Sequence, residues 1–150
     1  MIICDTREQK NEHILKYFEK HGIEHENAAV DTADYYSTDN PSIRVERKKD
    51  LGELAHNLLS RDKGRFYREI RRAREKGLKV YVVCENGKGV KNIEDVAKWE
   101  NQYGKVTGRE LREAIYKCAI AYGIEFLFCN RRQTGKLIYE ILNGKVRAVK

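Results

Sequence analysis

Apolar residues recur along the chain with two periods, one typical of β-strands and one typical of α-helices. Short apolar or alternating segments predict strands at residues 1–4, 23–30, 43–48, 79–84 and 124–129. Segments with an apolar residue at every third or fourth position predict helices at residues 11–21, 51–59, 65–76, 93–99, 107–121 and 132–142. Because strands and helices alternate, we expect a three-layer α/β domain with a central mixed β-sheet flanked by helices.

The clearest turn signal lies at residues 37–42, which read STDNPS and hold the only proline. The polar stretch before this turn either continues the second strand or pairs beside it. The segment after the turn, residues 43–48, alternates regularly, so we expect a hairpin with Glu46 and Lys48 on one face of its second strand and Arg47 on the other.

No repeat, low-complexity tract or linker interrupts this pattern. We expect a single domain over residues 1–144, followed by a basic tail at residues 145–150. Within the domain, Thr107 and Glu110 have the spacing of a capping box at the start of one helix, and Gly123 is expected to end that helix.

The composition is basic, with 30 Lys and Arg against 23 Asp and Glu and a net charge of +7. This surplus favours a polyanionic partner, and nucleic acid is the first candidate. The charge alone is equally compatible with a basic protein that binds no nucleic acid.

The four cysteines have no CxxC spacing and no nearby histidine at zinc-finger spacing, so they predict buried free thiols in a reducing compartment. Asp5, Arg7 and Glu8 interrupt any early apolar segment, which argues against a signal peptide. No apolar stretch approaches the length of a membrane span. We expect a soluble, cytoplasmic protein with no membrane partner.

The hairpin carries the most informative polar residues, Asp34, Glu46 and Lys48. If the hairpin folds Asp34 back beside Glu46, two carboxylates and one ammonium converge at a sheet edge. Carboxylates bind Mg²⁺ or Mn²⁺, and a lysine stabilises the charge that develops at a phosphate during hydrolysis. A salt-bridged surface strand would show the same alternation, so the triad alone is a weak signal.

A second polar cluster, Asp5-Thr6-Arg7-Glu8, follows the first predicted strand. Ligand-binding groups gather at the carboxyl ends of strands in open α/β sheets. Asp5 and Glu8 are therefore candidates for the metal site, and Arg7 is a candidate for holding a phosphate. The alternative is a charged loop that caps the first helix.

In this order, D-T-R-E, A-D-Y and V-E-R-K resemble the motifs of the XPF-type structure-specific nucleases. The segments E-L-A-H-N-L, R-F-Y-R-E-I-R-R-A, V-Y-V-V-C-E and T-G-K-L-I extend the resemblance over nearly the whole chain. It is similar in particular to small stand-alone members of the family, often found in phages or prophages. The resemblance implies a restriction-endonuclease-like fold and a metal-dependent DNA endonuclease.

By position, the resemblance implies catalytic roles for Asp34, Glu46 and Lys48, with Mg²⁺ or Mn²⁺ held by Asp34, Glu46 and Asp5. It implies supporting roles for Asp5, Arg7, Glu8 and Arg47, where the backbone carbonyl of Arg47 approaches the metal.

Two departures from the family pattern stand out. Ala33 replaces the glycine that the family has before Asp34, so we expect an ordinary backbone conformation there. The family also has an aspartate soon after Glu-Arg-Lys; here Asp50 comes early and Glu53 late, which leaves that ligand open. The tandem helix-hairpin-helix module and the helicase domain of larger relatives have no counterpart in this sequence.

Six arginines are candidates for contacts with the DNA backbone: Arg7, Arg65, Arg68, Arg72, Arg131 and Arg132. Tyr67 and Tyr103 are candidates for stacking on unpaired bases, although a solvated helix face with partly buried tyrosines is as compatible with the sequence. Trp99 lies between charged residues, and packing is a better explanation for it than a base wedge.

We therefore predict hydrolysis of branched, flapped or other non-duplex DNA in repair, recombination or phage DNA processing, by a monomer, a homodimer or with a partner protein. Two alternatives stay open. One is a non-catalytic DNA-binding or scaffolding subunit that assists an active nuclease. The other is a nuclease of the same fold with another substrate, such as a Holliday-junction resolvase or a restriction enzyme.

Overall fold

The computed structural model describes residues 1–87, 89–102 and 104–146. Its strands are β1 (Ile2–Asp5), β2 (His25–Ala28), β3 (Tyr35–Ser37), β4 (Asn40–Lys48), β5 (Lys79–Glu85) and β6 (Glu125–Cys129). Its helices are α1 (Glu12–Lys20), α2 (Leu51–Leu59), α3 (Lys63–Glu75), the short 3₁₀ helix η1 (Glu94–Lys98), α4 (Gly108–Tyr122) and α5 (Thr134–Leu142).

All six strands form one sheet, in the order β2-β1-β3-β4-β5-β6. The pairs β1–β2, β4–β5 and β5–β6 are parallel, whereas β3 runs antiparallel to both of its neighbours. The sheet is thus mixed, as predicted. Its parallel strands all end at one edge, and β3 begins at that same edge, so the segments that carry the candidate residues meet there.

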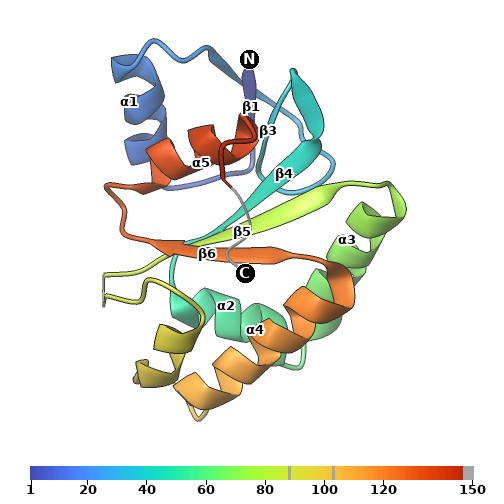
Figure 1. The fold of residues 1–150 in the computed structure, drawn as a ribbon, viewed down its shortest axis with the longest axis vertical. Helices are drawn as coiled ribbons and strands as arrows, with labels where there is room; N and C mark the ends of the chain where they lie inside the picture. The colour runs from blue at the N-terminus through green and yellow to red at the C-terminus, as the bar shows by residue number, and fades with distance from the viewer. Residues whose placement is uncertain (88, 103, 147–150) are drawn as a thin grey trace.

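Helices cover both faces of this sheet (Figure 1). On one face, α1 and α5 pack over a core that includes Phe18, Tyr35 and Val45. On the other face, α2, α3 and α4 pack over a second core that includes Leu54 and Ile115. The three-layer α/β prediction is confirmed, because each face of the sheet buries its apolar side chains under its own helices.

The hairpin of β3 and β4 forms as predicted, with Ser37 paired to Asn40 across a two-residue turn. Most predicted elements also form within a few residues of their expected bounds. The exceptions are residues 23–30, where only His25–Ala28 is a strand, and residues 93–99, which form a 3₁₀ helix rather than an α-helix.

The predicted signals at both ends of α4 are confirmed. The Thr107 hydroxyl accepts a hydrogen bond from the Glu110 backbone N–H, and the Glu110 carboxylate accepts one from the Thr107 N–H. Gly123 ends the helix in the left-handed conformation, with φ 67°.

All four cysteines are buried free thiols, as predicted. Within the described residues, no helix has the length and apolar character needed to cross a membrane. The predicted basic tail lies mostly outside the described residues, since positions 147–150 are not among them.

Candidate active site

Asp34 and Glu46 come together because the backbone of the hairpin places them side by side. The Asp34 N–H donates to the Val45 carbonyl at 2.9 Å, and the Asp34 carbonyl accepts the Asp5 N–H at 2.9 Å. The Asp34 side chain then accepts the Arg47 backbone N–H at 2.8 Å. These bonds fix the Asp34 carboxylate against the end of β4, next to Glu46.

The expectation of an ordinary backbone at Ala33 is wrong, because this residue has a φ of 65°. The left-handed region costs a residue with a Cβ about 1–2 kcal/mol. Hydrogen bonds on both sides of the Asp34 peptide hold the turn in place, and alanine has the smallest side chain that could meet this demand. The chain therefore adopts at Ala33 a backbone conformation that glycine would adopt without strain.

Both carboxylates are half-buried, and the Glu46 side chain is 12% exposed. Burial is the main cause that raises the pKa of Asp34 to about 6. Burial, and then the charge of Asp34, raise the pKa of Glu46 well above its usual range. The pair therefore holds back a proton at a pH where ordinary carboxyl groups have lost theirs.

Lys48 completes the predicted triad. Its Nζ lies 3.8 Å from Glu46 Oε1, and its side chain is 10% exposed. The same ammonium sits 5.0 Å from the centre of the Phe66 ring on α3. Phe66 thus holds the lysine against the sheet edge, beside the carboxylates.

Asp34, Glu46 and Lys48 line one open cavity of about 230 Å³. Glu53 lines it too, and its Oε1 accepts the Lys49 backbone N–H at 2.8 Å. Asp50 instead caps α2 by accepting the Glu53 N–H at 2.7 Å. Of the two carboxylates left open by the sequence, Glu53 is the one that reaches this cavity.

Glu69 on α3 is a site neighbour that the sequence reasoning missed. Its charge is among the causes that raise the pKa of Glu46. It lies three positions after Phe66, on the same side of α3, and no sequence signal marks it because the Phe66–Lys48 contact depends on how α3 packs on the sheet.

The loop after β1 is held mainly by its own contacts. The Asp5 carboxylate accepts bonds from Arg7 Nε at 3.0 Å and from the Val30 N–H at 3.2 Å. Arg7 also donates to the Val30 carbonyl at 2.7 Å, although its side chain is 75% exposed. Each Asp5 oxygen thus accepts one hydrogen bond, which orients this carboxylate at the cavity that it lines with Asp34 and Glu46.

Glu8 is likewise engaged, since it accepts the Tyr35 hydroxyl at 2.8 Å and pairs with Arg47 Nη1 at 3.0 Å. The described residues contain no group of three or more His, Cys, Asp or Glu side chains arranged to hold a metal ion. Asp34 and Glu46 are adjacent, and Asp5 and Glu8 line the same cavity. The expected ligand set of Asp34, Glu46 and Asp5 stays a prediction.

The Arg47 side chain lies on the opposite face of β4 from Glu46, as predicted, and it is only 2% exposed. It pairs with Glu85 at 2.8 Å, and Glu85 also accepts bonds from the Thr134 hydroxyl at 2.6 Å and from His13 at 2.5 Å. Sequence reasoning missed this cluster, because Glu85, His13 and Thr134 are far apart in the chain. It joins β4 and β5 to α1 and α5 directly behind the candidate site.

The predicted DNA-contacting arginines lie at two places. Arg65, Arg68 and Arg72 are exposed on α3, the helix that carries Phe66. Arg131 and Arg132 are exposed after β6, at the edge where the parallel strands end.

The two tyrosines proposed to stack on bases give different outcomes. Tyr67 packs against the core under α3, and its ring centre lies 5.9 Å from that of Tyr122, so packing explains it. Tyr103 lies outside the described residues.

Comparison with solved structures finds the same fold in XPF from Aeropyrum pernix, with a TM-score of 0.68 and 20% sequence identity over 95% of this chain and 65% of that one. A second match, XPF from Aeropyrum pernix in complex with DNA, has a TM-score of 0.70 and 22% identity over 99% of this chain and 67% of that one. The chain thus spans about two thirds of the length of these proteins.

A search of curated proteins finds no match. By contrast, the sequence pattern of the ERCC4 domain matches residues 4–141. This match includes every candidate residue of the hairpin, the loop after β1 and α3. The chain therefore belongs to the ERCC4 domain family and is a nuclease domain of the XPF type.

Proposed function

We propose that this domain is a divalent-metal-dependent DNA endonuclease that cuts branched, flapped or other non-duplex DNA. The observation that carries the proposal is the adjacency of Asp34 and Glu46, two half-buried carboxylates with raised pKa values, beside Lys48. The exposed arginines on α3 and after β6 supply the positive charge that a DNA backbone requires.

The carboxylate pair fits a hard divalent cation such as Mg²⁺ or Mn²⁺. Lys48 offsets only part of the charge of two ionised carboxylates. Burial is the main cause of their raised pKa values, and a bound cation would favour the ionised forms that burial disfavours. When bound, such an ion polarises the phosphate and activates water. Asp34 and Glu46 would hold it, with Glu53 at the side of the same cavity.

The chain's own residues then have distinct tasks. The Lys48 ammonium would neutralise charge that builds on the phosphate during cleavage, because Phe66 and Glu46 hold it in a site with little water. The hydrogen bond from the Arg47 N–H fixes one Asp34 oxygen, so the carboxylate is oriented before the substrate arrives. Arg7 is exposed at the same cavity and is suited to hold a phosphate.

The decisive experiment is cleavage of labelled fork, flap, four-way-junction and duplex DNA in Mg²⁺, Mn²⁺ or EDTA. We expect metal-dependent cutting that Glu46→Gln and Lys48→Met each lower by about 10²-fold or more. Glu26→Gln is the matched control, because Glu26 is an exposed carboxylate on β2. No metal-dependent cleavage of any branched or single-stranded DNA would refute the proposal.

The same experiment separates the alternatives. Salt-sensitive binding to the fork without cutting would identify a scaffolding subunit. Preferential cutting of four-way junctions would identify a resolvase, and preferential cutting of plain duplex would identify an enzyme closer to restriction endonucleases.

A further inference from the structure

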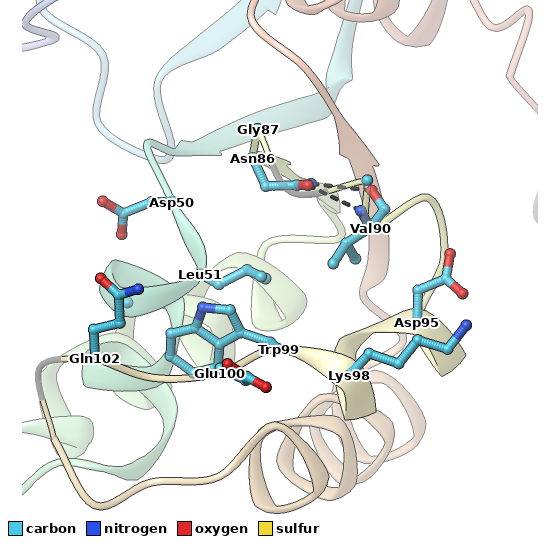
Figure 2. A pocket seen from close by; sticks show the side chains of 12 residues that line it. Asp50, Leu51, Asn86, Gly87, Val90, Asp95, Lys98, Trp99, Glu100 and Gln102 are labelled. Carbon is cyan, nitrogen blue, oxygen red and sulfur yellow. Dashed lines mark hydrogen bonds between the residues drawn. The ribbon is translucent and has the colours of Figure 1, made fainter.

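A second cavity, larger than the one that holds the candidate triad, lies beside it. It measures about 630 Å³, within the range of pockets that bind small molecules. Its walls come from the start of α2, the loop after β5, and η1 with the residues that follow it. In Figure 2 the Trp99 indole forms one wall, with Leu51 beside it and Asn86 and Val90 across the space.

This cavity is the immediate neighbour of the candidate active site. The turn that leads into α2 lines both spaces. Lys48, Lys49 and Glu53 line the smaller one, and the residues between them, Asp50–Gly52, line the larger one. A DNA strand with a phosphate beside Lys48 would therefore have its neighbouring nucleotides within reach of the larger cavity.

The lining is chemically suited to a base rather than to a phosphate. Asp50, Asp95 and Glu100 are carboxylates that would repel a phosphate, whereas Lys98 supplies a single positive charge. Carboxylate oxygens accept hydrogen bonds from the amino groups of bases. Leu51, Val90 and the face of Trp99 provide apolar surface for a flat ring.

The surrounding residues hold the Trp99 ring in a fixed position. It is partly buried and packs against the core on the α4 side of the sheet, so its ring is held in place without being covered. Its backbone N–H donates to the Val96 carbonyl at 3.0 Å, which anchors it at the end of η1. An aromatic ring held in this way loses little freedom when a base stacks on it.

We propose that this cavity receives an unpaired nucleobase from the DNA strand beside the site of cleavage, stacked on Trp99. The inference rests on the proposed function and deepens it, because it supplies a physical reason for a preference for non-duplex DNA. A base inside a duplex is stacked and paired and cannot enter the cavity. A base at a fork or flap is already free.

Trp99 also provides the test, because it is the only tryptophan in the chain. The protein is titrated in EDTA, which prevents metal-dependent cutting, with a fork, with a duplex of equal length, and with the same fork carrying abasic sites next to the junction. We expect only the intact fork to quench the Trp99 emission. Anisotropy of labelled DNA measures binding in each titration.

Two variants extend the test. Trp99→Leu should weaken fork binding by about tenfold while duplex binding changes little, and Trp99→Phe should keep most of the affinity. Circular dichroism establishes that both variants fold. Saturated fork binding with unchanged Trp99 emission, or equal quenching by the duplex or the abasic fork, would overturn the inference.

The two proposals fail separately. Cutting in Mn²⁺ without fork-specific quenching would refute the base pocket and support the nuclease. Fork-specific quenching without cutting in any metal would support the base pocket and refute the nuclease.

Discussion

At position 33 an alanine occupies the left-handed region of the backbone, with φ 65° and 7% of its surface exposed. Sequence rules favour an ordinary conformation for alanine, but the bonds from Asp34 to Val45 and to Asp5 set the geometry of this peptide. The strain lies one residue before a candidate metal ligand. Backbone outliers held by their surroundings are typical of functional sites.

A glycine at position 33 should leave stability nearly unchanged. Relief of about 1–2 kcal/mol of strain is offset by about 0.4–1 kcal/mol of added flexibility in the unfolded chain and about 0.8 kcal/mol of lost methyl burial. Ala114→Gly is the matched control, because Ala114 has the same 7% exposure inside α4. It should cost about 1–2 kcal/mol in urea unfolding. Equal losses in both variants would contradict the strain at Ala33.

Glu46→Gln should stabilise the metal-free protein at neutral pH. A folded pKa above the ordinary value of 4.5 means that the folded state binds the proton more tightly, so wild-type stability falls as pH rises above about 4.5. Glutamine carries no charge to desolvate. We expect a melting temperature about 2–4 °C above wild type at pH 7.5, for a gain of about 1 kcal/mol, and no such gain at pH 4.

Adding Mn²⁺ to the same thermal-melting series tests the site further. Wild type should gain stability, because a cation binds the folded state, whereas Glu46→Gln should gain little. Glu26→Gln should behave like wild type throughout. If Glu46→Gln melts below wild type at pH 7.5 without metal, the prediction that the Glu46 charge destabilises the metal-free protein is contradicted.

The candidate residues of the hairpin could be found from the sequence because they depend on local geometry. Alternation along β4 places Glu46 and Lys48 on one face, and a short turn returns Asp34 beside them. The partners of Asp5, Glu8 and Arg47 could not be found in this way. They depend on residues 25, 27 and 38 positions away, such as Val30, Tyr35 and Glu85, and no local pattern encodes these pairings.

At the scale of elements, α3 serves the site and the proposed DNA surface together. Its buried side holds Phe66 against Lys48, and its exposed side carries Arg65, Arg68 and Arg72. If the arginines bind DNA as proposed, the helix would couple the position of the lysine to the position of the bound strand. The apolar period of the sequence predicted this helix. It could not predict the contact with Lys48, because that contact depends on how α3 packs on the sheet.

Removing the α3 arginines should weaken DNA binding with little effect on folding. We expect the triple variant Arg65→Ala, Arg68→Ala, Arg72→Ala to lower fork affinity and to reduce the slope of log affinity against log salt by about 1 for each phosphate that is no longer neutralised. The control removes three exposed charges from α1 and α4, namely Lys16, Lys20 and Lys117. If the two triple variants lose affinity equally, α3 has no special role.

The junction between η1 and α4 is packed so tightly at Gly108 that one added methyl group would clash with the backbone. A Cβ at Gly108 would lie 2.4 Å from the Val96 carbonyl oxygen and 2.8 Å from that of Trp99. Gly108→Ala should therefore cost about 2 kcal/mol or more in urea unfolding and shift the Trp99 emission. At Gly104 the nearest atom would be 3.4 Å away, so Gly104→Ala should have little effect on either measurement. Similar losses in both variants would show that the clash is not the cause.

At the scale of the whole molecule, Glu85 joins the layers behind the site. It bonds to Arg47 on β4, Thr134 on α5 and His13 on α1, and its side chain is 3% exposed. Burial alone would raise its pKa, but the hydrogen bonds from Thr134, His13 and Arg47 outweigh burial and lower the pKa. Neither the alternation nor the periodicity of the sequence predicts this connection.

Glu85 and the carboxylate pair should give the molecule opposite responses to pH. The lowered pKa of Glu85 supplies stability that is present above about 4.5 and lost as the pH falls through its folded pKa. Glu85→Gln should therefore cost about 2–3 kcal/mol at pH 7, and this cost should shrink in acid. Glu125→Gln is the control, because its pair with Lys79 is more exposed and should contribute about 1 kcal/mol or less. A cost of Glu85→Gln that stays constant from pH 7 to pH 3 would contradict this assignment.

The hairpin has a consequence for how such domains diversify. Asp34, Glu46 and Lys48 lie within one short segment whose geometry is closed by its own backbone, whereas α3 and the cavity beside Trp99 come from elsewhere in the chain. Mutations of the exposed α3 arginines or of the cavity lining would leave the hairpin backbone and the Phe66 contact of Lys48 intact. The DNA preference of the proposed nuclease could then be redesigned on these outer surfaces without moving the carboxylates that we propose hold the metal.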